Sequence, residues 1–424
     1  MKAYPTYKDS GVQWLGNIPT HWKIVKLRNL LHKTTQKGRP DLPLLSVVRE
    51  QGVILRDVES KEENHNYIPD DLSNYKVLRD GQFVINKMKA WQGSYSVSSL
   101  TGIVSPAYFI YDVDYTDLIP QFFNTAIRSR AYIGFFNQAS DGVRIGQWDL
   151  DEAHMRNIPL FVPTLEEQNA IVAYLDKKCA EIEELIRRRQ SIIERLRELK
   201  QSIIAEAVTK GLHPDVPMKE SGIAWMPEVP EHWEIRKLKY TFSERTEKNH
   251  PDEPILCATQ SHGVIPQSLY KNRVVVVNKG FEGLKFVKCG DFVISLRSFE
   301  GGIEYAYYQG IISAAYTVLT PNIEEQAYFM KWLFKSKPFI QLLQTCVIGI
   351  REGQNINYQA LSRKFIVLPP LKEQRMIVDY LDKKCAEIDE LVARQEQIIE
   401  KLKELKTSTI AHVVTGKVDV RDAI

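Results

Sequence analysis

Carboxylates spaced close to lysines are the first residues to test for catalysis, because metal-dependent nucleases combine such groups. Glu198 with Lys200, and again Glu404 with Lys406, resemble a fragment of a nuclease motif. All four residues lie in long charged stretches with helical periodicity, where such residues are usually solvated charges on a helix face. We therefore assign them no catalytic role.

Motifs for nucleotide, methyl-transfer or metal chemistry are missing from the sequence. The run Thr415-Gly416-Lys417 lacks the upstream glycine of a phosphate-binding loop, and the Pro-Pro pair at 369 and 370 is not followed by an aromatic residue. There is no Gly-x-Gly-x-x-Gly turn, and the five cysteines have no zinc spacing. The sequence predicts a chain that is not an enzyme and that holds no metal and no cofactor.

Two histidines and two cysteines could also carry chemistry, but their repetition argues against it. His21 and His232 each precede a tryptophan, and either could be a catalytic base or a nucleic-acid contact. Because the His-Trp pair recurs at equivalent positions, we interpret it as a buried packing corner. Cys179 and Cys385 recur on amphipathic helices, and we interpret them as small core side chains.

Polar and aromatic residues that follow predicted strands are better candidates for function. The first such loop contains Lys87, Lys89, Trp91 and Gln92, and the equivalent loop contains Arg297, Ser298, Phe299 and Glu300. Loops that differ in chemistry on equal frames suit direct readout of DNA bases, in which Arg, Lys or Gln reach groove edges and an aromatic ring contacts or wedges. Ordinary solvated loops are the alternative interpretation.

A second pair of loops carries residues that both halves share. Arg144 and Gln147 recur as Arg351 and Gln354, in glycine-containing segments, and Asn355 follows the second copy. Shared groups suit contacts with phosphates, which are independent of sequence, and a structural turn is the alternative. We treat all five residues as candidate DNA contacts.

The chain is an internal duplication. The segment from Ser10 to Leu27 recurs from Ser221 to Leu238, and the segment from Leu165 to Thr209 recurs from Leu371 to Thr415. Between these anchors only short islands align, such as Gly81 to Ile85. One scaffold therefore carries two different surfaces, as a protein needs in order to read two different sequences with one geometry.

Each copy includes a long helix. Residues Leu165 to Val208 contain neither Gly nor Pro, and Thr164 with Glu167 has the spacing of a capping box. Apolar residues recur at alternating steps of three and four, which predicts a coiled-coil seam. The predicted seam consists of Ile182, Leu185, Ile192, Leu196, Leu199 and Ile203 in the first helix and Ile388, Leu391, Ile398, Leu402 and Leu405 in the second. We expect the two helices to pair with each other, antiparallel.

The remainder of each half mixes strand-like and helix-like runs. Predicted strands cover Phe83 to Asn86, Ile103 to Tyr111, Val274 to Asn278 and Phe292 to Leu296, and predicted short helices cover Gln121 to Phe136 and Glu324 to Leu343. The fold class is α/β, with two recognition domains separated by long helices that form an antiparallel coiled coil. The predicted segments are domain 1 (1–162), the central helix (163–210), domain 2 (211–368) and the C-terminal helix (369–424).

Composition limits the location and the partners of the chain. A hydrophobic content of 44% in 424 residues supports two or three folded domains. The net charge of +3 does not by itself predict a nucleic-acid partner, so any such surface depends on how the charges are arranged. No run approaches the ~18 apolar residues of a membrane helix, and the polar N-terminus is unlike a signal peptide. We expect a cytoplasmic protein.

The duplicated pattern resembles the specificity (S) subunits of type I restriction-modification systems. The resemblance covers essentially the whole chain. It rests on the Ser-Gly-x-x-Trp to His-Trp segments, on the segments Pro159 to Gln168 and Leu368 to Gln374, and on the repeated Tyr-Leu-Asp motif in the long helices.

The resemblance implies that the chain reads double-stranded DNA with a bipartite target. Each recognition domain would read one half, and the helices would set the gap and dock methyltransferase subunits. It further implies two methyltransferase (M) subunits that use S-adenosylmethionine, and restriction (R) subunits that use ATP and Mg. A nuclease with unrecognised catalytic residues and a coiled-coil adaptor without DNA affinity are the alternatives. Salt-sensitive binding to duplex DNA would exclude the adaptor.

Overall fold

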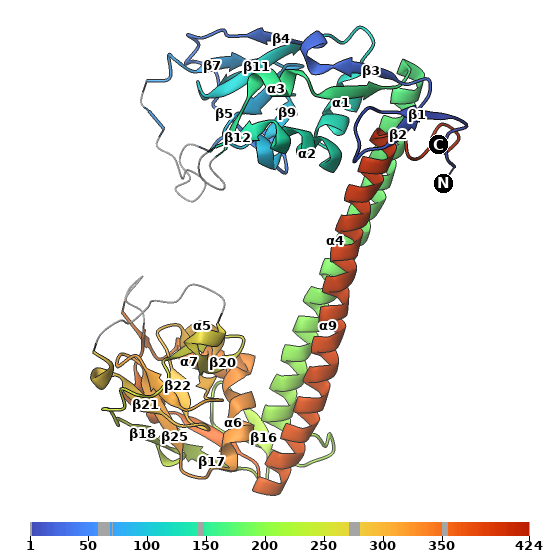
Figure 1. The fold of residues 1–424 in the computed structure, drawn as a ribbon. Helices are drawn as coiled ribbons and strands as arrows, with labels where there is room; N and C mark the ends of the chain where they lie inside the picture. The colour runs from blue at the N-terminus through green and yellow to red at the C-terminus, as the bar shows by residue number, and fades with distance from the viewer. Residues whose placement is uncertain are drawn as a thin grey trace. The chain divides into compact units, whose positions relative to one another are not determined.

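The computed structural model of the protein describes residues 2–57, 68–69, 71–142, 148–270, 280–349 and 355–423 (Figure 1). The chain divides into two compact units. Unit 1 comprises Met1–Arg189 and Gln397–Ile424, and unit 2 comprises Gln190–Glu396. Each unit thus includes part of both long helices. The predicted segment boundaries after residues 162, 210 and 368 stay predictions.

Unit 1 is built around an antiparallel sheet with the strand order β4-β11-β8-β9. These strands are β4 (Leu31–Thr34), β8 (Phe83–Asn86), β9 (Tyr95–Val97) and β11 (Tyr108–Val113). Two-stranded pairs surround the sheet: β1 (Tyr7–Asp9) with β2 (Asn17–Pro19), β3 (Lys23–Lys26) with β14 (Pro159–Val162), β5 (Leu45–Val48) with β6 (Gly52–Leu55), β7 (Lys76–Leu78) with β10 (Gly102–Val104), and β12 (Ser140–Asp141) with β13 (Asp149–Leu150). The helices are η1 (Leu27–Asn29), η2 (Ala90–Gln92), α1 (Pro120–Ile127), α2 (Arg130–Gln138) and α3 (Glu152–Arg156).

Unit 2 repeats this plan with the strand order β18-β25-β22-β23. These strands are β18 (Phe242–Arg245), β22 (Phe292–Ile294), β23 (Glu304–Tyr305) and β25 (Thr317–Pro321). The two-stranded pairs are β15 (Met218–Glu220) with β16 (Glu228–Pro230), β17 (Glu234–Lys237) with β28 (Phe365–Leu368), β19 (Leu256–Thr259) with β20 (Gly263–Pro266), β21 (Lys285–Val287) with β24 (Gly310–Ile312), and β26 (Val347–Ile348) with β27 (Asn355–Ile356). The helices are η3 (Leu238–Tyr240), η4 (Gln267–Leu269), η5 (Phe281–Gly283), α5 (Ser298–Gly301), α6 (Gln326–Lys335), α7 (Lys337–Gln344) and α8 (Tyr358–Ser362).

Each four-stranded sheet is covered on both faces, because its strands are apolar on both sides. In unit 1, the rings of Phe83 on β8 and Phe123 on α1 have centroids 5.3 Å apart, and Tyr95 on β9 stacks on Phe136 of α2 at 4.0 Å. The opposite face packs on apolar residues of β5, β7 and β10. Unit 2 has the same two-sided packing. Two mixed α/β units with paired long helices are the predicted fold class.

The predicted strand Phe83–Asn86 is confirmed as β8. The single run predicted from Ile103 to Tyr111 is instead divided between β10 and β11, which belong to different sheets. The run from Phe292 to Leu296 begins with β22, which ends at Ile294. The predicted strand from Val274 to Asn278 lies outside the described residues.

Each predicted short helix is two helices. Gln121 to Phe136 is divided between α1 and α2, and Glu324 to Leu343 is divided between α6 and α7. The breaks fall at Ser129 (ψ 157°) and Ser336 (ψ 142°), which are extended. Pro338 explains the second break, because a proline inside a helix loses one hydrogen bond and clashes with the carbonyl four residues earlier. Both halves keep the break because they share the framework.

The long helices are α4 (Leu165–Lys210) and α9 (Leu371–Val414), as their Gly-free and Pro-free sequences predict (Figure 1). Each ends at a glycine with positive φ, Gly211 at 78° and Gly416 at 70°. A left-handed residue after the last turn is a common helix terminator, and glycine adopts it without steric cost.

Ion pairs between the two helices fix their relative direction. In unit 1 Lys406 Nζ lies 2.5 Å from Glu183 Oε1, and in unit 2 Lys200 Nζ lies 2.7 Å from Asp389 Oδ1. As the residue number rises along α4, the number of its partner on α9 falls. The predicted antiparallel pairing is therefore confirmed.

The seam between the helices differs from the predicted one at alternate positions. Ile182, Leu196, Ile203, Ile388, Ile398 and Leu402 are buried or half-buried. The prediction was wrong at Leu185, Ile192, Leu199, Leu391 and Leu405, which are 42%, 38%, 50%, 45% and 50% exposed. Ile193, which follows Ile192, is buried at 6% exposed, and Ile186 and Val392, which follow Leu185 and Leu391, are half-buried. A seam alternates steps of three and four, so two possible seams can share one residue in every seven and differ by one position at the residue between. At Leu185 and Ile186, for example, the sequence is apolar at both positions.

None of the helices in the described part of the chain combines the length and the apolar composition that a membrane crossing requires. The long helices α4 and α9 are long enough but carry charged residues throughout.

Candidate nucleic-acid interface and its framework

The first candidate loop of unit 1 meets the hairpin of β12 and β13. Lys87 Nζ lies 2.9 Å from Asp149 Oδ2, and the Leu150 amide donates to the Lys87 carbonyl at 2.9 Å. The rings of Trp91 and Trp148 have centroids 5.1 Å apart. These two regions are separate in the sequence, and the fold brings them together. We call the residues Lys87, Met88, Lys89, Trp91, Trp148 and Asp149 edge cluster 1.

Edge cluster 1 presents both a flexible apolar side chain and a positive charge to solvent. Met88 is 58% exposed, and Lys89 is exposed. Trp91 and Gln92 are half-buried, and the buried Nε1 of Trp91 has no hydrogen-bond partner among the described residues. The cluster can thus offer an ammonium, a thioether and the edge of an indole to a ligand.

The equivalent loop of unit 2 has different chemistry. Leu296 is 47% exposed and Arg297 is exposed, whereas Phe299 is half-buried against the core. The prediction that Ser298 contacts DNA is contradicted, because this residue is only 1% exposed. Its Oγ accepts a hydrogen bond from the Ser295 amide at 2.8 Å, so it holds the turn after β22.

The unit 2 loop also lies against a hairpin. Helix α5 contacts β27, as η2 contacts β13 in unit 1. Asn355 on β27 is half-buried, and its Oδ1 accepts from the Ile356 amide at 2.8 Å. We call Leu296, Arg297, Phe299 and Asn355 edge cluster 2. The shared candidates Arg144, Gln147, Arg351 and Gln354 lie outside the described residues.

Further lysines gather on the sheet of unit 1. Lys76 Nζ donates to the Tyr108 carbonyl at 2.5 Å. Burial lowers the pKa of the Lys76 ammonium below its ordinary value, and the charges of Lys33 and Lys37 lower it further. Lys37 also pairs with Lys76 in an isolated β-bridge. The sequence does not identify these lysines as a group.

The same place in unit 2 is not uniformly basic. Lys285 Nζ donates to the Tyr316 carbonyl at 2.7 Å, which repeats the bond of Lys76. Its neighbour is Glu244 at 3.7 Å, on β18, where β4 of unit 1 carries Lys33. A sequence signal for the shared lysine existed, because Lys76 and Lys285 both stand five residues before the repeated glycine of the Gly81 island.

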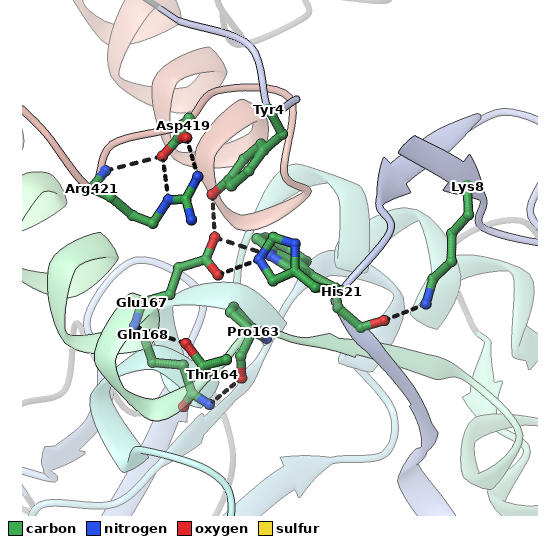
Figure 2. A network of polar contacts seen from close by, with 10 residues as sticks. Tyr4, Lys8, His21, Pro163, Thr164, Glu167, Gln168, Asp419 and Arg421 are labelled. Atoms are coloured by element: carbon green, nitrogen blue, oxygen red, sulfur yellow. Dashed lines mark hydrogen bonds and ion pairs between the residues drawn. The ribbon is translucent and has the colours of Figure 1, made fainter. Parts of the chain in front are cut away.

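The duplicated His-Trp pairs bind a glutamate in the first turn of a long helix. In unit 1, His21 Nε2 lies 2.8 Å from Glu167 Oε2 (Figure 2). Trp22 Nε1 donates to Glu167 Oε1 at 3.0 Å. Tyr4 donates a further hydrogen bond to Glu167 Oε1. We call His21, Trp22 and Glu167 corner 1.

Corner 2 consists of His232, Trp233 and Glu373. The His232 Nε2 to Glu373 Oε2 distance is 2.7 Å, and Trp233 Nε1 donates to Glu373 Oε1 at 3.1 Å. Both tryptophans are buried, as predicted. The histidines are not buried, because their side chains are 40% and 46% exposed in corners 1 and 2.

Each corner also receives the end of the other long helix. A Cβ on Gly416, after α9, would lie 2.3 Å from Pro19 Cδ and 3.3 Å from the Trp22 ring. A Cβ on Gly211, after α4, would lie 2.9 Å from Glu373 Oε1. Only glycine fits at these two positions. The corners therefore have a structural role, which is to join both long helices to each unit.

Of the cysteines of the long helices, Cys179 is half-buried and Cys385 packs in the core of unit 2. Cys385 is 2% exposed, and burial raises the pKa of its thiol to about 11. A thiol with a raised pKa is a poor nucleophile. Across the described ranges, no three His, Cys, Asp or Glu side chains lie close enough to share a metal ion.

Sequence comparisons relate the chain to specificity proteins. Residues 230–404 match the family described as Type I restriction modification DNA specificity domain. The putative type I restriction enzyme MjaX specificity subunit of Methanocaldococcus jannaschii is 26% identical over 295 residues, which cover 65% of this chain and 63% of that protein. The type I restriction enzyme EcoBI specificity subunit of Escherichia coli is 25% identical over 164 residues, or 32% of this chain and 35% of that protein. The matched part of the chain thus spans less than two thirds of either relative.

Solved structures share the fold. A structure from work on complex assembly and conformational transition of the type I R-M system has a TM-score of 0.66 and 19% identity, over 95% of this chain and 99% of that chain. The HsdS subunit from Thermoanaerobacter tengcongensis has a TM-score of 0.51 and 18% identity, over 97% and 100%.

The fold and the repeated corners define a duplicated protein in which two mixed α/β units share an antiparallel helix pair. The sequence matches then relate residues 230–404 to the type I restriction modification DNA specificity domain, and the chain is similar to specificity subunits of type I restriction-modification systems.

Proposed function

We propose that this chain is the DNA specificity subunit of a type I restriction-modification complex, and that each unit reads one half of a bipartite target. One observation carries the proposal: two units with the same framework present different chemistry at the same strand ends. Edge cluster 1 contains lysines and tryptophans, whereas edge cluster 2 contains an exposed arginine and leucine. A protein that bound one repeated ligand would have no use for this difference.

Edge cluster 2 suits direct readout in a groove. Arg297 is exposed beside Leu296, and an arginine can donate two hydrogen bonds to the O6 and N7 of guanine. In edge cluster 1, Lys89 is the exposed cation and Met88 can make an apolar contact. Lys87 is held by Asp149 at 2.9 Å, so it orients the loop unless a phosphate displaces the carboxylate. The shared candidates Arg144, Gln147, Arg351 and Gln354, together with Asn355 of edge cluster 2, are proposed as further contacts with DNA.

The outer side of the helix pair is proposed to bind the methyltransferase subunits. The register set by Glu183 and Lys406 puts the exposed Leu185 and Leu405 on one side of unit 1. Leu199 and Leu391 have the same relation in unit 2, where each residue is at least 45% exposed. An exposed apolar pair repeated in both units suits two copies of one partner.

The helices α4 and α9 are further proposed to set the number of unread base pairs between the half-sites, because they connect the units that read them. The chain itself is non-catalytic and cytoplasmic in this proposal. S-adenosylmethionine, ATP and Mg belong to the M and R subunits. Predicted segments 1–162 and 211–368 would then be the two target recognition domains.

Methylome sequencing tests the proposal directly. The chain is expressed with its neighbouring methyltransferase subunit in cells that lack the modification. The expected result is a new split methylated motif that vanishes when this chain is omitted. No new motif, with both subunits shown to be assembled, would contradict the proposal.

Substitutions then test which residues read which half-site. Arg297→Ala should relax or change one half of the motif, and Lys89→Ala should affect only the other half, since one base contact contributes about 1–3 kcal/mol of discrimination. Lys239→Ala is the matched control, because it removes an exposed cation from η3, outside both edge clusters. Loss of both halves with Arg297→Ala, or of neither, would count against its assignment.

A further inference from the structure

A buried glutamine in the first turn of each long helix has complete hydrogen bonding in only one unit. Gln168 Nε2 donates to the Pro163 carbonyl at 3.0 Å, and its Oε1 accepts from the Ile119 amide at 2.7 Å. Gln374 Nε2 donates in the same way to the Pro369 carbonyl at 2.8 Å. Its Oε1, however, has no hydrogen-bond partner among the described residues.

The two units differ in the turn that precedes α1 in unit 1 and α6 in unit 2. Because of this difference, Gln374 lacks the donor that Gln168 has. In unit 1 the Ile119 amide immediately precedes α1 and is directed to Gln168. In unit 2 the amide of Gln326, the first residue of α6, donates instead to the Ile323 carbonyl at 3.1 Å. Gln374 is only 2% exposed, so water does not readily reach its carbonyl oxygen. A buried acceptor without a donor is costly, and a ligand with an N–H group would relieve it.

A cavity of about 310 Å³ lies at this glutamine. Its walls are Glu325, Tyr328, Gln374, Arg375, Val378 and Asp379. Arg375 is paired with Glu325 at 3.1 Å, whereas the exposed Asp379 has no ion pair within the described part of unit 2. The walls thus carry a net negative charge, an unpaired acceptor and an aromatic ring.

One exposed apolar side chain, Tyr328, lines the cavity, and two more, Met376 and Tyr380, adjoin its wall residues Arg375 and Asp379 along α9. Tyr328 is 54% exposed, Met376 is 43% exposed and Tyr380 is 37% exposed. In unit 1 the residues that match Met376 and Asp379 are alanines, at 170 and 173, and the match of Tyr380 is Tyr174, which is 7% exposed. The surface therefore exists in one unit only. Two identical partner subunits, each bound to the framework that both units share, would not account for a surface that is present in unit 2 only.

We propose that this cavity binds the side chain of an arginine from a partner protein, in one copy per chain. The guanidinium group can pair with Asp379 and stack on the Tyr328 ring, and it can also donate to Gln374 Oε1 when that buried side chain turns toward the cavity. The apolar rim favours a protein over a free small molecule, because exposed aromatic and methionine side chains around a polar anchor are typical of protein interfaces. The inference does not rest on the proposed reading of DNA.

The first test is an NMR titration of the full chain with methyl-labelled methionines, in which the Met376 signal is assigned by Met376→Leu. Probes are capped arginine, capped citrulline and capped lysine. Capped arginine should shift the Met376 signal saturably, and citrulline, which has the same shape but no charge, should bind about ten-fold more weakly. Equal shifts with arginine and citrulline, or no saturable shift with arginine, would overturn the proposal.

Variants locate the site and a longer probe identifies the source of the arginine. Asp379→Ala should weaken binding of capped arginine about ten-fold, whereas Glu390→Gln, which removes an exposed negative charge further along α9, should not change it. A capped Leu-Arg-Leu peptide should bind more tightly than capped arginine, because its leucines reach the apolar rim. Equal binding of the two would reject a partner protein in favour of a free guanidinium compound.

Discussion

The two corners have nearly the same geometry, whereas the two edge clusters share almost none of their chemistry. The His-Glu distances are 2.8 and 2.7 Å and the Trp-Glu distances are 3.0 and 3.1 Å. At the strand ends, unit 1 has a salt-bridged lysine and a pair of tryptophans, whereas unit 2 has an exposed arginine and a buried serine. Buried charge networks tolerate little change, whereas exposed loops tolerate much. The repeat is thus preserved in the corners, which hold the long helices, and has diverged in the exposed edge clusters.

Glu167→Ala in corner 1 should have the largest effect on stability. It leaves the buried Trp22 Nε1 and the Tyr4 hydroxyl without their acceptor, and we expect a loss of roughly 4 kcal/mol in the free energy of unfolding. Glu373→Ala should cost less, because its carboxylate is 18% exposed against 2% for Glu167. Urea titrations monitored by tryptophan fluorescence would measure both. Equal losses would show that Tyr4 and burial add nothing to corner 1.

Adjacent isoleucines on α4 test the corrected seam. Ile193→Ala should cost about 3 kcal/mol, because its side chain is 6% exposed, whereas Ile192→Ala, at 38% exposed, should cost less than about 1 kcal/mol. Thermal unfolding followed by circular dichroism at 222 nm compares the two variants. The reverse order would restore the seam phase that the sequence predicts.

Gly416→Ala tests how tightly the end of α9 fits corner 1. A Cβ at this residue would meet Pro19 at 2.3 Å and would be attached at φ 70°, so we expect a cost of about 2 kcal/mol. Gly11→Ala is the matched control, because its φ is 73° but nothing lies within 4 Å of the added carbon. That variant should lose only about 1 kcal/mol. Differential scanning calorimetry would separate the steric cost from the backbone cost.

A buried carboxylate should give unit 2 a pH dependence near neutrality. Burial raises the pKa of Glu304 to about 7, although Lys335 at 2.6 Å opposes the shift, and unit 1 has no such carboxylate in its equivalent strand β9. The folded state therefore binds this proton more tightly than the unfolded state. Its contribution to stability is full below the unfolded pKa and is lost as the pH rises through about 7. Glu304→Gln should flatten this slope and stabilise the protein by about 1 kcal/mol at pH 8. A slope in urea midpoints that is the same in the variant would assign it to other groups.

The parts of the fold that depend on local pattern could be predicted from the sequence. The duplication, the two long helices and their antiparallel pairing follow from repeated segments and from a Gly-free apolar period. The seam phase could not be predicted, because Leu185 and Ile186 are both apolar and only the partner helix decides which one is buried. The break at Ser129 was missed because no proline marks it in the first copy.

The candidate site was predicted only in outline. Lys87 and Trp91 were identified from their loop, but their contacts with Asp149 and Trp148 depend on a pairing of strands distant in sequence. Ser298 was assigned to the surface because it lies in the loop that follows a predicted strand, and its buried bond to the Ser295 amide has no sequence signature. Glu167 was recognised as part of a capping box, but not as the acceptor of Trp22, because 145 residues separate them.

The contact between the two ends of the described chain has a consequence for the order of synthesis. The Asp419 amide donates to the Lys2 carbonyl at 2.9 Å, and Lys417 Nζ donates to the carbonyl of Leu15 at 2.7 Å. Unit 1 therefore combines residues that are translated before unit 2 with residues that are translated after it. Unit 2, which is one continuous stretch, can complete its core while the nascent Trp22 still lacks its covering glycine. A chaperone that binds exposed tryptophan during translation would therefore bind Trp22, in the part of unit 1 that is translated before unit 2.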